Sequence, residues 1–221
     1  MTLHSDGIHE AMKRPDLQDR LIISPILEPA TQIGPGSVDL RLGTEFLELN
    51  RAGEHLLDPF REGSTPFEHG LAERRTVVPF GEGIALHPSQ FVLGCTLEFL
   101  SVPRDISGQV VSRSSWGRLG LLVATAVTVQ PGYKGVLTLE LVNTGAVPIF
   151  LRPGTRIAQL QLWRADQPTS TPYEGRYRVP TGPESARFGR ERAEGATLAH
   201  IGQRLAQYRA PATEAVGTAH G

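Results

Sequence analysis

The hydrophobic pattern of the chain begins with one short helical segment. Residues 5–14 carry apolar side chains at helical spacing: Ile8, Ala11 and Met12. Ser5 or Asp6 is a suitable N-cap, and Pro15 follows where a helix has to end. The pattern therefore predicts a single helix at this end of the chain.

After this helix, short apolar runs alternate with turns rich in glycine and proline. The runs are SVDLRL, EFLEL, RTVVPF, GIAL, QFVLGCTLEFL, ISGQVVS, GVLTLELVN, IFL and IAQLQLW. Their length, their content of β-branched and aromatic residues, and their close spacing are typical of strands. No helical pattern separates them. The sequence therefore predicts an all-β fold, a distorted barrel or a jelly-roll-like sandwich.

The residue composition changes again at Pro168, after which the chain is polar and rich in turn-forming residues. Such a segment is a mobile tail unless something orders it. Residues 191–208 carry alanine, leucine, glutamine and arginine and predict a terminal helix, although Gly195 and Gly202 weaken it. The last dozen residues are expected to be disordered. We therefore expect a main domain over residues 1–190 and an extension over 191–221.

The composition of the chain limits the classes of partner that it can bind. The 221 residues carry a net charge of −1, so no global basic field is available to hold a nucleic-acid polymer. The single cysteine, Cys95, excludes an internal disulfide framework and lies in an apolar run, where a core residue is expected. No run approaches 18 apolar residues, so no membrane partner and a cytoplasmic location are expected.

Residues 113–143 carry the candidate chemistry. Arg113, Ser114 and Ser115 form a cationic, hydroxyl-rich turn followed by a run punctuated with glycine. A guanidinium and two hydroxyls next to turn amides can bind phosphate oxygens. A solvated loop is the other interpretation of three such residues taken alone.

Glu140 is the acidic residue of the run TLELVN. Strict alternation places Leu137, Leu139 and Leu141 on a core face and Glu140 on the other face. On that face Glu140 either points to solvent or lines a cavity. A partly buried carboxylate can take a proton from water and return it later, as acid–base catalysis requires.

A zinc-dependent nucleotide deaminase needs a cysteine- and histidine-rich ligand set. This chain has one cysteine, and its seven histidines show no ligand spacing. We therefore expect no zinc and no other protein-bound metal. A nucleophilic Cys–His pair also lacks support, because Cys95 lies in the middle of a strand.

These runs resemble the dCTP deaminase family of the dUTPase-like superfamily, from about residue 4 to about residue 188. The matching segments are SVDLRLG, ALHPSQFVLGCTLEFLSVP, SRSSWGRLGLL, PGYKGVLTLELVN and LRPGTRIAQL, followed by a tail of the family's tyrosine- and glycine-rich type. The resemblance implies a homotrimer of distorted β-barrels with active sites at the subunit interfaces. It also implies zinc-free deamination of dCTP to dUTP, with Mg²⁺ bound through the substrate triphosphate.

Residue by residue, the resemblance implies that Glu140 is the catalytic glutamate and Arg118 the arginine beside it. It implies a set of substrate-binding residues: Arg113, Ser114, Ser115, Ala126, Gln130, Tyr173 and Arg176. Arg176 stands at a position where the family has a phosphate-contacting lysine. Ala126 corresponds to a small residue near the attacking water.

The chain departs from the family pattern at three places. Gln130 replaces an aspartate that contacts the sugar 3′-hydroxyl and, in enzymes that hydrolyse the triphosphate, helps to activate water. An amide can still bind a hydroxyl but cannot act as a general base. The run between Leu122 and Pro131 is one residue short and lacks a common histidine, and Pro180 replaces a phosphate-reaching glutamine.

The sequence therefore predicts a nucleotide enzyme that deaminates dCTP or a close pyrimidine analogue. Two alternatives stay open at this point. One is a dUTPase-type or bifunctional nucleotide diphosphatase, which Gln130 disfavours. The other is a non-catalytic, nucleotide-binding regulatory homologue.

Overall fold

The computed structural model describes residues 1–50, 72–123, 128–175, 177, 179–187 and 189–209. One compact unit comprises Met1–Asn50 and Ala72–Ser185, and a second comprises Arg51–Leu71 and Ala186–Gly221. In the second unit, the described element is helix α4 (Gly189–Arg209). The terminal helix predicted over 191–208 is thus confirmed, whereas the residues after Arg209 lie outside the described part. The predicted division at residue 190 stays a prediction.

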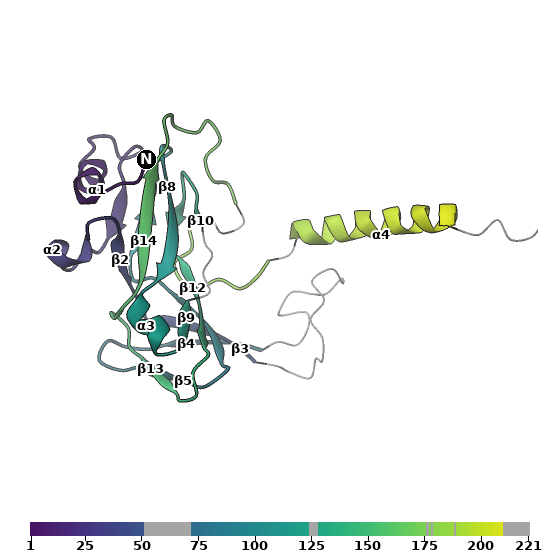
Figure 1. Cartoon of the computed structure of the whole chain (residues 1–221), viewed down its shortest axis with the longest axis horizontal. Helices are drawn as coiled ribbons and strands as arrows, with labels where there is room; N and C mark the ends of the chain where they lie inside the picture. The colour runs from purple at the N-terminus through teal and green to yellow at the C-terminus, as the bar shows by residue number, and fades with distance from the viewer. Residues whose placement is uncertain (51–71, 124–127, 176, 178, 188, 210–221) are drawn as a thin grey trace, which may run out of the picture. The chain divides into compact units, whose positions relative to one another are not determined.

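The first unit is built from antiparallel strands (Figure 1). The strands are β1 (Ile22–Ser24), β2 (Val38–Arg41), β3 (Glu45–Asn50), β4 (Ala72–Val77), β5 (Ile84–Leu86), β6 (Phe91–Cys95), β7 (Phe99–Ser101), β8 (Ile106–Ser112), β9 (Leu121–Val123), β10 (Thr128–Val129), β11 (Lys134–Gly135), β12 (Thr138–Asn143), β13 (Ile149–Leu151) and β14 (Arg156–Arg164). The helices are α1 (Ser5–Met12), α2 (Pro29–Gln32) and α3 (Ser114–Arg118).

The described strands form four sheets. Two large sheets have the orders β10-β8-β14-β2 and β4-β3-β6-β12-β9, and two small ones have the orders β1-β7-β11 and β13-β5. Their inner faces enclose one hydrophobic core, in which residues such as Phe46, Leu100 and Leu160 are fully buried. The predicted all-β class is confirmed. None of the described helices is both long and apolar enough to span a membrane.

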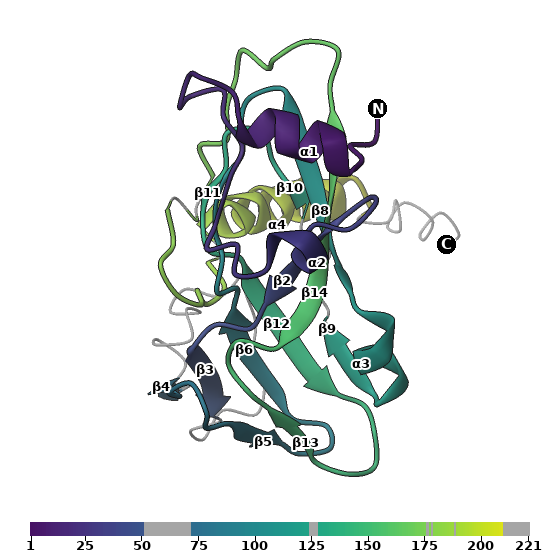
Figure 2. The ribbon, with the colours of Figure 1, turned by 90° about the vertical axis from the view of Figure 1, so that its left-hand side faces the viewer.

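Three details differ from the sequence-based predictions. The N-cap of α1 is His4 rather than Ser5 or Asp6, and its side chain makes no capping hydrogen bond. Burial of Ile8 and Ala11 therefore holds the helix more than a cap does. The expected turn at 113–115 instead begins helix α3, and α2 is a second unpredicted short helix (Figure 2).

The long apolar run from 90 to 100 divides into β6 and β7 at a buried polar turn. Within this turn Glu98 is fully buried, and its carboxylate accepts hydrogen bonds from Gln32 Nε2 at 2.9 Å and from the Arg41 backbone N–H at 2.8 Å. Loss of hydration raises the pKa of Glu98 to about 7. Nearby Cys95 is a buried core residue, as expected, and burial raises the pKa of its thiol to about 11.

Candidate active site

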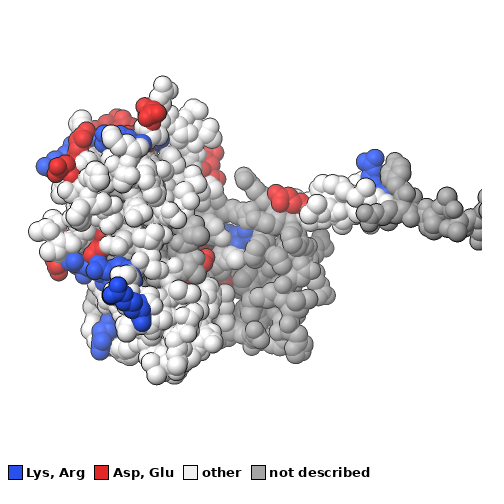
Figure 3. Space-filling model, in the orientation of Figure 1, with Lys and Arg blue, Asp and Glu red and all other residues white. Residues whose placement is uncertain are grey.

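A cluster of arginines and acids surrounds the start of α3. Arg113 is the residue before α3, and its guanidinium forms an ion pair with Asp39 of β2. The Trp116 indole donates to the carbonyl of Arg156 at 2.9 Å, which holds α3 against β14. Ser114 and Ser115 are exposed in the first turn. Figure 3 shows basic side chains on this part of the surface, where α2 and α3 lie in the view of Figure 1.

Asp39 is the centre of this cluster because strand register gathers its partners. Gln159 of β14 lies directly opposite Asp39, and its Nε2 donates to Asp39 Oδ1 at 3.1 Å. Arg156, from the same strand, reaches Asp39 Oδ2 at 3.5 Å. The Arg113 and Asp39 side chains are 31% and 10% exposed. A phosphate group that bound here would therefore meet the partly exposed guanidinium of Arg113, which Asp39 already holds in place.

Asp39, Arg156 and Gln159 were not among the residues predicted from the sequence. Asp39 and Gln159 are polar residues inside strongly apolar strands, in the runs SVDLRL and IAQLQLW, and Arg156 is the first residue of the second of these strands. That signal was available, but their meeting with Arg113 depends on the pairing of β14 with β2. The turn predicted to bind phosphate is therefore one part of a larger cluster of charged and polar side chains.

Glu140 lies on β12 with the predicted orientation. Leu139 and Leu141 are fully buried, whereas Glu140 is half-buried on the opposite face together with Thr138 and Val142. Glu140 pairs with Leu93 of β6 in the middle of the five-stranded sheet. Its carboxylate thus lies on the face of β12 that points away from the core, which is the face where it can line a cavity.

Arg118 is the last residue of α3 and is exposed. Two residues separate it from Leu121, which starts β9 and pairs with Asn143 at the end of β12. The chain thus leads from the Arg113 turn, through Arg118, to the strand next to the one that carries Glu140. The direct contact between Arg118 and Glu140 stays a prediction.

The tail after β14 is ordered along the edge of the core by backbone hydrogen bonds. Tyr173 N donates to the Pro131 carbonyl at 2.9 Å, and Val136 N donates to the Pro180 carbonyl at 2.9 Å. Further on, Glu184 N donates to Thr138 Oγ1 at 3.1 Å. Thr138 shares the half-buried face of β12 with Glu140. The tail therefore runs from the Gln130 turn to the face that carries Glu140.

Two glycines permit this close approach of the tail. Gly132 and Gly135 have φ angles of +84° and +134°, which favour glycine. A Cβ on Gly132 would lie 2.8 Å from Pro172 Cβ, and a Cβ on Gly135 would lie 2.3 Å from Pro180 Cδ. Pro180, one of the departures from the family pattern, is buried and packs directly on this turn.

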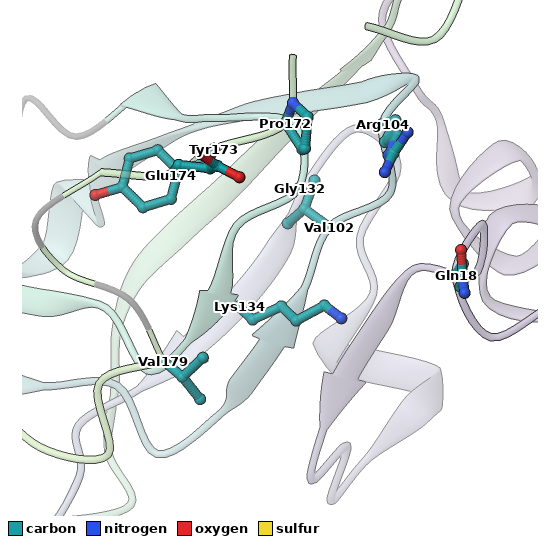
Figure 4. A pocket seen from close by; sticks show the side chains of 9 residues that line it. All are labelled: Gln18, Val102, Arg104, Gly132, Lys134, Pro172, Tyr173, Glu174 and Val179. Atoms are coloured by element: carbon teal, nitrogen blue, oxygen red, sulfur yellow. The ribbon is translucent and has the colours of Figure 1, made fainter. Parts of the chain in front are cut away.

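Tyr173 packs against Tyr133, with ring centroids 5.6 Å apart and an interplanar angle of 53°. Beside it lies a pocket of about 280 Å³, lined on one wall by residues that precede β12, such as Val102 and Lys134, and on the other by residues of the tail. Figure 4 shows Arg104 and the Lys134 amine on the side of Gln18, with Tyr173 and Val179 across from them. Sequence reasoning did not identify these two cations. Neither has a side-chain hydrogen bond or ion pair with another described residue.

The remaining predicted residues divide into two groups. Gln130 is described and exposed, and its carbonyl accepts a hydrogen bond from Tyr133 N at 3.1 Å. Ala126 and Arg176 lie outside the described residues, as does part of the shortened run after Leu122. Within the described residues, no three His, Cys, Asp or Glu side chains are arranged to hold a metal ion.

Comparison with known proteins places these features in a family. Residues 3–165 match the model of the family described as dCTP deaminase-like. The chain is 42% identical over 180 residues to a dCTP deaminase of Natronomonas pharaonis, covering 79% of this chain and 90% of the relative. It is also 42% identical over 182 residues to a "dCTP deaminase, dUMP-forming" of Halobacterium salinarum, covering 80% and 91%.

A solved structure supports the fold. The crystal structure of 2′-deoxycytidine 5′-triphosphate deaminase from Agrobacterium tumefaciens superposes with a TM-score of 0.51 at 24% identity. The superposition covers 73% of this chain and 47% of that chain. Because the family model and relatives above 40% identity cover most of this sequence, the chain belongs to the dCTP deaminase-like family.

Proposed function

We propose that the protein is a zinc-independent hydrolase that deaminates dCTP, or a close pyrimidine nucleotide, to dUTP and ammonia. The observation that carries the proposal is the position of Glu140. It is a half-buried carboxylate on an ordered strand, approached from one side by the tail and from the other by the strand that follows Arg118. The names of the curated relatives give the reaction class.

Glu140 would take a proton from a water molecule while the oxygen adds to C4 of the cytosine ring. Glu140 would pass this proton to N3, which gives a tetrahedral centre with a hydroxyl and an amino group on C4. Glu140 would then move the hydroxyl proton to the amino group, and the C4–N bond breaks as the C4=O bond forms and ammonia leaves. Water alone is a poor nucleophile, and a positioned base of this kind contributes roughly 10²–10⁴-fold. Arg118 would orient Glu140 and balance charge close to it.

Phosphate binding is assigned to the cluster around Asp39. Arg113 and the Ser114 and Ser115 hydroxyls would contact the triphosphate, and Asp39 would keep Arg113 in place. Mg²⁺ would enter with the triphosphate as part of the substrate. Tyr173 and Arg176 of the tail, with Gln130 and Ala126 near the sugar and base, would complete the site.

The assembly is proposed to be a homotrimer with sites between subunits. Several hydrophobic side chains on strands of the first unit are exposed in the single chain: Val77, Phe91, Leu122 and Phe150. Exposed apolar residues on ordered strands are suited to contacts between copies. Sedimentation equilibrium would test this, with three protomers expected and a monomer contradicting it.

A second candidate is the bifunctional reaction that also removes pyrophosphate. It is supported by the names of several relatives, including those of Halobacterium salinarum and Dictyoglomus thermophilum, which are called dUMP-forming dCTP deaminases. Gln130 argues against it, because an amide cannot deprotonate the water that attacks the phosphoanhydride. Incubating the protein with a panel of nucleotides, and measuring both ammonia and pyrophosphate, tests the two reactions separately.

A further inference from the structure

Glu28 is an exposed acid whose carboxylate lies between two arginines of the cluster. Its Oε2 is 2.6 Å from Arg156 Nη2, and its Oε1 is 3.5 Å from Arg41 Nη2. The two arginines come from β14 and β2, whose register brings Arg156 opposite Arg41. One carboxylate thus bridges two guanidinium groups contributed by neighbouring strands.

Arg41 is an incompletely satisfied buried cation. Its side chain is 11% exposed, and Nη1 donates to the Gly154 carbonyl at 2.8 Å. Its Nε and Nη2 are buried and have no hydrogen-bond partner among the described residues, although the Glu28 carboxylate lies within ion-pair distance. Buried guanidinium donors are normally all bonded, so this arginine is short of acceptors. A phosphate group offers more acceptor oxygens than a carboxylate does.

Glu28 is able to leave this position at little cost to the fold. Its side chain is 61% exposed, in contrast to 22% for Arg156 and 11% for Arg41. Although Glu28 is the N-cap of α2, its side chain makes no capping hydrogen bond. The Thr31 hydroxyl that donates to Glu28 Oε2 at 3.0 Å is itself exposed to solvent. Asp39 is different, because it is 10% exposed and also binds Gln159. Glu28 is therefore the replaceable acid of the cluster.

We propose that Arg41 and Arg156 form a phosphate-binding cradle next to the Arg113 turn, and that Glu28 occupies this cradle until the triphosphate group of the substrate displaces it. A carboxylate and a phosphate both bind guanidinium groups through paired oxygens, so each can take the other's place. Because the ligand is the triphosphate of the proposed substrate, this inference rests on the proposed function.

The test is the affinity of the protein for inorganic tripolyphosphate, measured by isothermal titration calorimetry at fixed ionic strength. Glu28→Gln removes the competing charge and keeps the shape, so binding should become about three- to tenfold tighter. Glu10→Gln is the matched control. Glu10 is 70% exposed and lies 3.8 Å from Arg164, which is also close to a second acid, Asp105. This control should change the affinity less than about twofold.

Arg41→Met should weaken tripolyphosphate binding at least about tenfold, because it removes the inner half of the cradle. Thermal unfolding checks that the variant is folded, and Arg156→Gln replaces it if it is not. Unchanged or weaker binding by Glu28→Gln, or unchanged binding by the arginine variant, overturns the proposal. Tighter binding by Glu28→Gln together with no ammonia from dCTP would uphold the cradle and refute only the proposed reaction.

Discussion

Burial of Glu98 should make the protein less stable as the pH rises from about 5 to 8. Burial raises its pKa to about 7, against an ordinary value of 4.5. Between these values the unfolded chain loses the proton while the folded chain keeps it. The folded state therefore binds more protons, and the free energy of unfolding falls with rising pH. The difference of about 2.5 pKa units corresponds to at most about 3 kcal/mol, reached above pH 7.

The assay is chemical denaturation of the wild type and of Glu98→Gln at several pH values from 5 to 8. Protein concentration is held constant, because self-association would change the apparent stability. The variant loses the titrating group, so its free energy of unfolding should change less over this range than that of the wild type.

Asp105 does not disturb this comparison. Its hydrogen bonds with the Arg14 guanidinium lower its pKa, so the stability that it contributes is lost only as the pH falls below its ordinary range near 3.8. That range lies below the pH values compared. Equal slopes for wild type and Glu98→Gln between pH 5 and 8 would refute the reasoning.

Three further predictions concern the site. Glu140→Gln should lower the rate of ammonia release from dCTP at least about 10²-fold while the oligomer persists in size-exclusion chromatography; turnover within threefold of wild type would remove Glu140 as the base. Truncation after Gln167 should leave a folded protein with severely reduced turnover, whereas truncation after Arg190 should have little effect; full activity of the shorter protein would contradict a role for the tail. Activity should survive a zinc-selective chelator and fall when Mg²⁺ is removed, and stoichiometric zinc in active protein, found by elemental analysis, would contradict this.

The hydrophobic periodicity of the sequence was sufficient to predict those parts of the fold that depend on residues close together in the chain. The alternation in TLELVN correctly placed Leu139 and Leu141 in the core and Glu140 on the other face. The same reasoning failed at His4, because α1 is held by burial of its apolar face rather than by a capping side chain. It also did not show that Ser114 begins a helix, since four or five residues carry no clear period.

The site was less predictable because its contacts are distant in sequence. Asp39 and Gln159 are 120 residues apart, and only the pairing of β14 with β2 brings them together. The polar composition of the tail indicated mobility. Its order comes from backbone hydrogen bonds to residues such as Pro131 and Val136, which composition does not encode. Gly132 and Gly135 are needed because the tail packs closely against their turn, and this reason is visible only once the position of the tail is known.

The most direct test of the central claim is the product formed from dCTP and Mg²⁺ by the purified wild-type protein. Ammonia release is measured enzymatically, and the phosphorus species are identified by ³¹P NMR. The account predicts one equivalent of ammonia and an intact triphosphate, dUTP. Because Gln130 lacks a basic group, dUMP with pyrophosphate would contradict its assigned role and favour the bifunctional reaction. Nucleotide consumed without ammonia, or dCTP left unchanged, would contradict the proposed deamination itself.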